Sequence, residues 1–459
     1  MTARVAAAVV AAFLLVLLAP GCGDDQDLLP TEELMKPEAC MSCHPKHFQE
    51  WSGSMHAYAA DDPVFLAMNR RGQEDTGGQL GDFCVGCHAP MAVRLGLTTD
   101  GLNLAEVPQW AKGVTCFFCH SVERVEGDHN NPLVLASDGV MRGGLRDAIT
   151  SPAHRSGYSD LLDVDAQTSS PLCGACHDIV TPAGVHLERT FTEWKTTIFA
   201  SELPRQHLSC GACHMVASTD VVADVPGLDV PLRQFGRREH TFAGIDVALT
   251  PWPEAEAQRA AIERDLKAVV APRVCVEPVD GGRIRYRLDN VGAGHMFPSG
   301  AAHDRRAWAE VIAYDAGGAV LFSSGVVPDG MDPEQLADPN LFGLWDRTFD
   351  AQGAPAKFFW DVASYDSRLL PPAVTTDPND PRFDHAVSQL YPIPGMAAQV
   401  ARVTARVRIR PLPYALLDEL TSSGHLDGAV RSALPTLEVS GSVLEWRPEL
   451  ADLGGCVNP

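Results

Sequence analysis

The chain has 459 residues, a length that favours two or three domains. Its hydrophobic content of 45% is ordinary for a globular protein, so a disordered chain is not expected. The formal net charge of −23 argues against a nucleic-acid partner, because phosphate binding needs clustered lysines and arginines. This acidity either steers basic partners toward the protein or only solvates its surface.

The first residues have the pattern of a signal peptide. Arg4 supplies a short positive region, and Val5–Leu18 is an apolar run too short for a spanning helix. A small residue before Cys22 favours lipoprotein processing, with Cys22 bearing the lipid, and ordinary cleavage with Cys22 as an incidental thiol is the alternative. We therefore expect a signal peptide over residues 1–21, an acidic tether over 22–38, and an exported lipoprotein in the periplasm or at the outer membrane.

Ten of the thirteen cysteines form five Cys-x-x-Cys pairs, and a histidine follows each pair directly. This pattern is the signature of covalent c-type haem attachment, in which two thiols hold the porphyrin and the imidazole binds the iron as proximal ligand. Zinc ribbons and redox-active Cys-x-x-Cys motifs are alternatives, but neither requires a histidine after every pair. The sequence thus predicts five covalently bound haem c groups. The attaching cysteines are Cys40, Cys43, Cys84, Cys87, Cys116, Cys119, Cys173, Cys176, Cys210 and Cys213, and the proximal histidines are His44, His88, His120, His177 and His214.

Cys275 and Cys456 lie near the two ends of the last region of the chain. We expect a disulfide between them, which fits the oxidising compartment that haem attachment also requires. Two separate buried thiols are the alternative.

The five motifs crowd into residues 40–214, which leaves little room for an aliphatic core. We therefore expect a loop-rich, mostly α domain over residues 39–250, packed around its haems. Ile262 and Leu266 stand at helical spacing and predict a linker helix over 251–272. Beyond residue 273 apolar residues alternate with polar ones, which predicts an antiparallel β-sandwich over 273–459. The expected fold class is α+β and multidomain. The expected strands include Arg283–Asn290, Trp308–Tyr314, Ala319–Ser323, Arg402–Arg410 and Leu437–Trp446, with a short helix over 412–423.

The sixth coordination position of each iron decides what a haem can do. A second histidine gives a low-spin electron carrier, whereas an open position can bind a small molecule. Of the sixteen histidines, eleven are not proximal, and seven of these precede residue 250. So many spare histidines beside five motifs predict mainly bis-histidine haems.

The segment CMSCHPKHFQEWSGSMHAYA, and later GVTCFFCHSVERVEGDHNN, resemble the tetrahaem cytochromes that accept electrons from hydroxylamine oxidoreductase, over about residues 39–177. This resemblance implies that His56 is the distal ligand of the third haem and His129 that of the first. It also implies that the second haem, bound at Cys84 and Cys87, has no protein sixth ligand. The fifth motif and the long C-terminal region depart from that family and supply further histidines for this position.

The later segments resemble a wider group of bacterial multihaem cytochromes, on the pieces MRGGLRDAITSPAHRS, GVHLERTFTEWK, REHTFAG and NVGAGHMFPSG. This resemblance favours His154, His186 and His240 as the remaining distal ligands. His207 is a weaker candidate. His295 stabilises a turn or contacts a haem. We expect packing roles for His47, Met91 and Met215.

The function expected from these features is electron transfer. The partners would be redox proteins, either other cytochromes or a membrane quinol-oxidising complex, with the membrane reached through the lipid anchor. The alternative is an oxidoreductase acting on a small nitrogen or sulfur compound at one five-coordinate haem, and it needs a polar pocket that no sequence motif marks. A binding role of the β-domain would add to either function.

Overall fold

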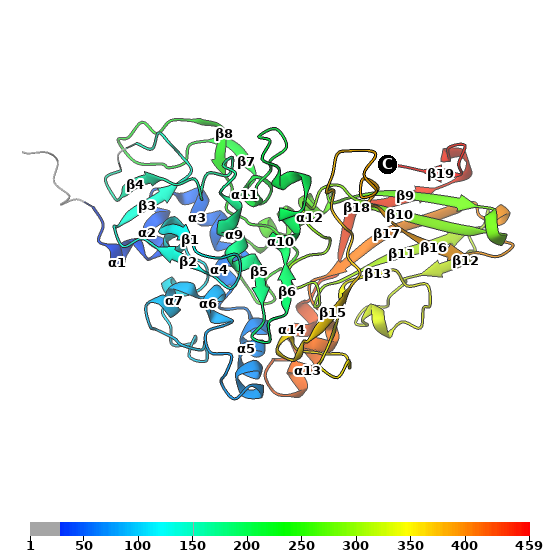
Figure 1. The fold of residues 1–459 in the computed structure, drawn as a ribbon, viewed down its shortest axis with the longest axis horizontal. Coiled ribbons are helices and arrows are strands. Elements are labelled where there is room, and N and C mark those ends of the chain that lie inside the picture. Colours follow the sequence, from blue (N-terminus) through cyan, green and yellow to red (C-terminus); the bar gives the residue numbers. More distant parts are fainter. Residues whose placement is uncertain (1–27, 150) are drawn as a thin grey trace, which may run out of the picture.

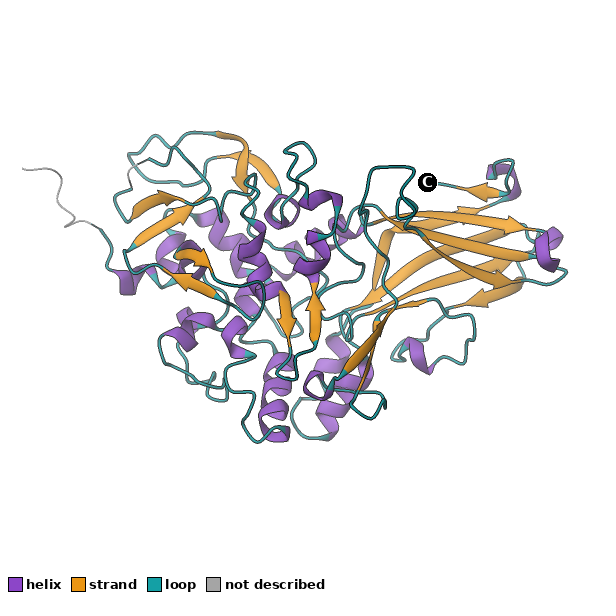
Figure 2. Ribbon diagram, viewed as in Figure 1, coloured by secondary structure: helices purple, strands orange, loops and turns teal. Residues whose placement is uncertain are grey.

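The computed structural model describes residues 28–149 and 151–459. The expected signal peptide and Cys22 lie outside these residues. The chain forms a helix-containing, loop-rich N-terminal part and a C-terminal part dominated by long antiparallel strands (Figures 1 and 2). The expectation of a multidomain, loop-rich α+β protein is confirmed. No helix among the described residues is long and apolar enough to cross a membrane.

The N-terminal part consists of short helices and small two-stranded sheets. Most helices end within two turns, because Pro, Gly and the haem motifs interrupt the chain. The helices are α1 (Thr31–Leu34), α2 (Pro37–Met41), α3 (Pro45–Ser52), α4 (Met55–Tyr58), α5 (Pro63–Asp75), α6 (Val85–His88), α7 (Pro90–Arg94), α8 (Cys116–His120), α9 (Ser170–His177), α10 (Thr190–Lys195) and α11 (Cys210–His214).

Four two-stranded sheets accompany these helices in the described N-terminal residues. Three are antiparallel, and the pair β3–β4 is parallel. The pairs are β1 (Val122–Val125) with β2 (Leu133–Leu135), β3 (Val140–Gly143) with β4 (Arg155–Tyr158), β5 (Asp178–Val180) with β6 (His186–Arg189), and β7 (Ala217–Asp220) with β8 (Arg233–Arg238).

The expected tether over residues 22–38 requires a correction. Helices α1 and α2 begin within it, and Leu34 is buried among Met91, Phe117 and Phe118. The apolar Leu34 and Met35 have a hydrophobic cluster to pack against, so this stretch belongs to the folded domain. Any acidic tether therefore ends before about residue 30.

The expected linker helix is α12 (Ala255–Leu266), and it is shorter than residues 251–272. Residues from Val270 onward already belong to strand β9 (Val270–Glu277). Ile262 is completely buried and Leu266 nearly so, both within the core of the C-terminal domain. The helix is therefore part of that domain's packing and not a free connector.

The C-terminal domain, called the β-domain below, contains two main sheets around one apolar core. One sheet has the strand order β16-β10-β9-β19, and the other has β12-β11-β17-β18 with β13 beside β11. Residues of both sheets, such as Ile284 and Val407, share a single cluster of fully buried side chains. The remaining elements are β10 (Arg283–Asn290), β11 (Arg306–Tyr314), β12 (Val320–Ser324), β13 (Gly343–Leu344), β14 (Asp346–Phe349), β15 (Ser364–Ser367), β16 (Val387–Pro392), β17 (Arg402–Arg410), α13 (Tyr414–Ser422), α14 (Val430–Ala433), β18 (Leu437–Trp446) and β19 (Cys456–Val457).

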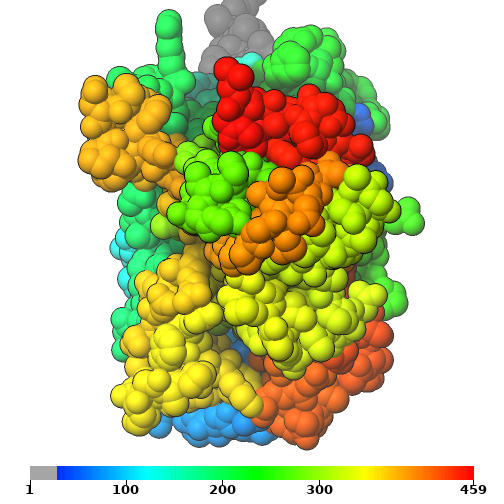
Figure 3. All heavy atoms as spheres, turned by 90° about the vertical axis from the view of Figure 1, so that its right-hand side faces the viewer, coloured from blue at the N-terminus to red at the C-terminus, as the bar shows by residue number. Residues whose placement is uncertain are grey.

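The two domains are packed together over a broad surface. Val64 and Ala67 of α5 share an apolar cluster with Leu417 and Leu420 of α13. Trp252 Nε1 donates a hydrogen bond to the Ser52 carbonyl at 2.8 Å. In the view of the β-domain end, the blue surface near residue 75 lies against yellow and orange surface of the C-terminal half (Figure 3). The β-domain is thus placed to contribute side chains to the haem region.

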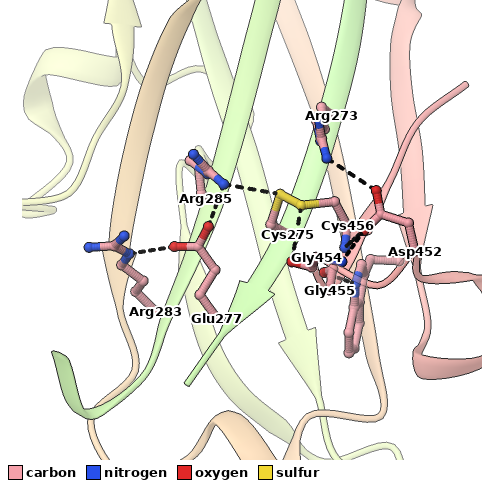
Figure 4. Close-up of a disulfide and its surroundings, with 10 residues drawn as sticks. Arg273, Cys275, Glu277, Arg283, Arg285, Asp452, Gly454, Gly455 and Cys456 are labelled. Carbon is pink, nitrogen blue, oxygen red and sulfur yellow. Dashed lines mark hydrogen bonds and ion pairs between the residues drawn. A yellow bond between two sulfur atoms is a disulfide. The ribbon is translucent and has the colours of Figure 1, made fainter. Parts of the chain in front are cut away.

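A disulfide joins Cys275 of β9 to Cys456 of β19 (Figure 4). These residues are direct neighbours in the antiparallel register, so β19 is held to the sheet edge by a covalent bond. The bond closes a loop with a sequence separation of 181 residues, which spans nearly the whole β-domain.

We predict that Cys275→Ala/Cys456→Ala destabilises the β-domain by about 2–4 kcal/mol, because the cross-link no longer restricts the unfolded chain. Urea titration followed by circular dichroism measures the change, with haem content as a control for maturation. An unchanged midpoint would show that the pairing of β19 holds the edge without the bond.

Candidate haem-binding site

Each Cys-x-x-Cys-His motif lies on a short helix or at its end. Residues three apart in a helix lie on one face, so the two thiols of a motif point the same way. Thr115 caps α8 by accepting a hydrogen bond from Phe118 N, and Ser209 caps α11 by accepting one from Ala212 N. None of these ten cysteines is in a disulfide. The described residues hold no group of three or more His, Cys, Asp or Glu side chains arranged for a metal ion, which a zinc ribbon would require.

Four of the five proximal histidines are oriented by backbone carbonyls. Nδ1 of His44 lies 2.8 Å from the Val222 carbonyl, that of His88 lies 3.0 Å from Ala59 O, and that of His214 lies 3.0 Å from Ala243 O. His120 Nδ1 likewise bonds the Arg142 carbonyl. A ring that donates through Nδ1 has an unprotonated Nε2, which is the tautomer that binds a metal. These side chains therefore fit a haem iron.

Four proximal histidines face a second imidazole at nearly the same separation. The ring centres of His44 and His154 are 6.3 Å apart, and those of His120 and His240 are 6.4 Å apart. The corresponding separations are 6.2 Å for His177 with His56 and 6.4 Å for His214 with His295. Two metal–nitrogen bonds of about 2 Å, with about 1 Å from each nitrogen to its ring centre, give a separation of about 6 Å. The spacing therefore fits two axial ligands of one iron.

The second histidines of these pairs are suited to metal binding. Nδ1 of His240 lies 3.0 Å from Arg238 O, and that of His295 lies 2.7 Å from Met296 O. Burial lowers the pKa of His56 and of His240 to about 3 and that of His295 to about 4. The rings are therefore neutral near pH 7, as an iron ligand must be.

The second motif differs from the others. The ring of His88 stacks on Phe65 of α5, with centres 4.0 Å apart and planes within 2°. No second histidine stands about 6 Å from His88 among the ring contacts of the described residues. The arrangement thus offers this position no second imidazole.

A partly buried charged cluster lies beside the second motif, with the Arg305 side chain 11% and the Asp246 side chain 45% exposed. Both Arg305 terminal nitrogens pair with Asp246, at 2.5 and 2.7 Å, and the charge of Asp246 acts on His88. Burial raises the pKa of Glu188, which also interacts electrostatically with His303 and Arg305. His303 Nδ1 is buried without a hydrogen-bond partner in the described part of the chain. These side chains come from β6, from the loop before α12 and from the β-domain.

The motifs form a connected group. The thiol of Cys40 lies close enough to that of Cys116 to affect its pKa, and the same holds for Cys173 and Cys210. Cys87 of the second motif affects the pKa of Cys176 of the fourth in the same way. Cys119 lies close enough to act electrostatically on both thiols of the fourth motif. The first, third and fourth motifs therefore form a row, and the second and fifth adjoin the fourth.

Only some of the expected distal histidines face a proximal histidine in the structure. His56, His154 and His240 each face a proximal ring, but His56 faces His177 of the fourth motif and not His120 of the third. The side chain of His129 is 44% exposed, and its Nδ1 lies 3.0 Å from Asp128 Oδ1. The segment after it turns through Asn130 and Asn131, both with positive φ.

His186 makes no ring contact with a proximal histidine among the described residues, and its Nε2 lies 3.1 Å from Asp178 Oδ2. His47 stands between the first and third positions, 5.9 Å from His44 and 4.7 Å from His240 between ring centres, in a packing position. Sequence reasoning left His295 undecided and missed Phe65. The sequence pattern offered no signal for the stacking of Phe65, whereas the turn NVGAGHMFPSG did mark His295.

Comparisons with known proteins agree with this site. Residues 39–121 match the sequence family described as cytochrome c554 and c-prime. No curated protein matches the chain. A solved penta-heme cytochrome c552 from Thermochromatium tepidum shares the fold with a TM-score of 0.59 at 20% sequence identity, covering 90% of this chain and 98% of that one. The repeated attachment motifs, the family match and the shared fold together support the assignment of this chain as a multihaem c-type cytochrome.

Proposed function

We propose that this protein is an exported electron carrier with five covalently attached haems, most of them bound by two histidines. The observation on which the proposal rests is the set of imidazole pairs at 6.2–6.4 Å. Five attachment motifs support a count of five haems, as does the shared fold with a protein described as penta-heme. When bound, such haems supply one-electron redox centres whose potentials depend on ligands and burial.

The proposed distal ligands are His154 for the first haem, His240 for the third and His56 for the fourth. Each ring stands opposite the corresponding proximal ring and is oriented or buried as a ligand should be. His129 and His186 are replaced in this scheme, because no ring contact with a proximal histidine is found for either of them among the described residues. The pairing of His56 with the third haem is replaced for the same geometrical reason.

The contacts among the motifs support electron movement between haems. The neighbouring thiols support an arrangement with the first haem beside the third, and the second and fifth beside the fourth. Electrons would enter or leave at the first, second or fifth haem and cross the third and fourth. A redox protein or a membrane quinol-oxidising complex would be the partner. Export, a periplasmic or outer-membrane location and lipid attachment through Cys22 are part of the proposal and rest on the N-terminal sequence.

The haem count gives the first prediction. The purified protein should contain five haems per chain by the pyridine haemochrome assay, and denaturation should not release them, because thioether bonds are covalent. Replacing Cys84 and Cys87 with alanine should lower the count to four. Haem that is extracted by acidic solvent, or a count other than five in the unchanged protein, would contradict the attachment scheme.

The ligand pairs give the second prediction. Substituting His154, His240 or His56 with alanine should each convert one ferric haem per protein from low spin to high spin, because one axial nitrogen is lost. Electron paramagnetic resonance with spin quantification measures the change. His129→Ala and His186→Ala are matched controls and should leave the spectrum unchanged. A new high-spin signal in His129→Ala would restore the family-based assignment of the first haem.

A second candidate function is reaction with a small molecule at the second haem. It is favoured by the Phe65 stack at His88 and by the neighbouring cluster of Glu188, Asp246 and Arg305. An iron without a second protein ligand can bind a small molecule, and acidic or basic side chains nearby can supply or accept protons. The substrate would be a small nitrogen or sulfur compound, as expected from the sequence.

We predict that azide or cyanide binds one ferric haem in five, because the other irons are filled by imidazole nitrogens. Optical titration at constant haem concentration measures the stoichiometry. Cys84→Ala/Cys87→Ala should abolish the binding together with the second haem. A ferric spectrum that does not change in excess cyanide would contradict an open sixth position at the second haem.

A further inference from the structure

The fifth motif has its facing histidine in the β-domain, far along the chain. The rings of His214 and His295 have centres 6.4 Å apart and planes within 6°. We infer that His295 is the sixth ligand of the fifth haem. We also infer that it is positioned by Glu193 of the N-terminal part, residues 39–250, which is called the haem domain below. The inference rests on the proposed haem attachment at Cys210 and Cys213. It gives the β-domain a direct part in haem coordination.

The turn that holds His295 is built around a buried asparagine. Asn290 Nδ2 donates to the carbonyl of His295 at 2.8 Å and to that of Leu370 at 3.1 Å. Its Oδ1 accepts a hydrogen bond from Ala293 N at 3.2 Å. Because Asn290 is only 2% exposed, these bonds are protected from water. The backbone at His295 is therefore fixed to the end of strand β10.

The ring of His295 is oriented within this turn. Its Nδ1 lies 2.7 Å from the Met296 carbonyl, which leaves Nε2 without a proton and directed away from that bond. Gly294 has a φ of +71°, a conformation that favours glycine, and it approaches Phe199 of the haem domain. A side chain at this position would be strained by the backbone conformation, although its Cβ would lie at ordinary contact distance from the Phe199 ring.

Glu193 ties this turn to the haem domain. Its Oε2 accepts hydrogen bonds from Met296 N at 3.2 Å and from Ser299 Oγ at 2.6 Å. The carboxylate is 8% exposed, so an unsatisfied oxygen here would cost free energy. Thr190 Oγ1 adds a hydrogen bond from Gly300 N at 3.0 Å. Helix α10 therefore holds the segment that follows His295 at two places, at Met296 and at Ser299–Gly300.

The same helix also holds the fifth motif. Trp194, the neighbour of Glu193, donates from Nε1 to the Leu208 carbonyl at 3.0 Å, two residues before Cys210. One short helix thus fixes the segment that leads to His214 and the turn that presents His295. The separation of the two rings depends on α10, and hence on the docking of the β-domain.

Substitution of His295 tests the ligand assignment. In the full-length holoprotein, His295→Ala should add one high-spin ferric haem per chain by quantitative electron paramagnetic resonance, and added imidazole should return it to low spin. His295→Met should keep that haem low-spin and raise its reduction potential, since methionine in place of histidine raises the potential of a haem. His385→Ala is the control, because His385 is a β-domain histidine whose ring faces no proximal histidine among the described residues.

Substitution of Glu193 tests the positioning role. Glu193→Ala should weaken the ligand, giving a partial high-spin signal at one haem or a shifted low-spin signal, whereas Glu193→Gln, which keeps an acceptor oxygen, should retain most of the low-spin signal. Haem content is measured for every variant. Fewer than five haems in the unchanged protein would overturn the proposed function. Five haems with unchanged spectra in both His295→Ala and His295→Met would overturn this inference alone.

Discussion

The separation of paired imidazoles is the constraint on which the haem domain depends. Two nitrogen ligands of one iron hold their ring centres about 6 Å apart. Four histidine pairs keep that spacing, while Phe65 and His88 stand at 4.0 Å, as rings in contact do. Backbone carbonyls bind Nδ1 of most of these histidines and direct Nε2 inward. The apolar clusters of the N-terminal part are small, which is compatible with the proposed packing around haems.

The β-domain has the large continuous apolar core that the haem domain lacks. Its core is one continuous cluster that unites both sheets, and the disulfide secures the edge strand β19. This rigid body presents the turn with His295 to α10 and presents His303 and Arg305 to the surroundings of the second motif. In the proposed scheme, domain docking would therefore affect two haem environments at once. The stability of the β-domain would then be coupled to the properties of those haems.

The sequence predicted local features well and long-range partners poorly. Alternation of apolar residues located β10, β17 and β18 to the residue, because each strand has one buried face. Each attachment motif is five consecutive residues, so it could also be predicted from the sequence. The partner of a proximal histidine is not local: His56 lies between the first two motifs yet faces the fourth, and the ring of His129 bonds its neighbour Asp128. Tertiary packing decides which histidine faces which proximal ring, and the spacing of residues in the sequence does not reveal it.

The number of bis-histidine haems tests this account most directly. Near-infrared magnetic circular dichroism of the ferric protein, calibrated by haem content, identifies the axial ligands of each low-spin haem. The account predicts four bis-histidine haems and one haem without a second histidine. Five bis-histidine haems would contradict the open sixth position proposed for the second haem. Fewer than four would contradict the four imidazole pairs proposed as axial ligands.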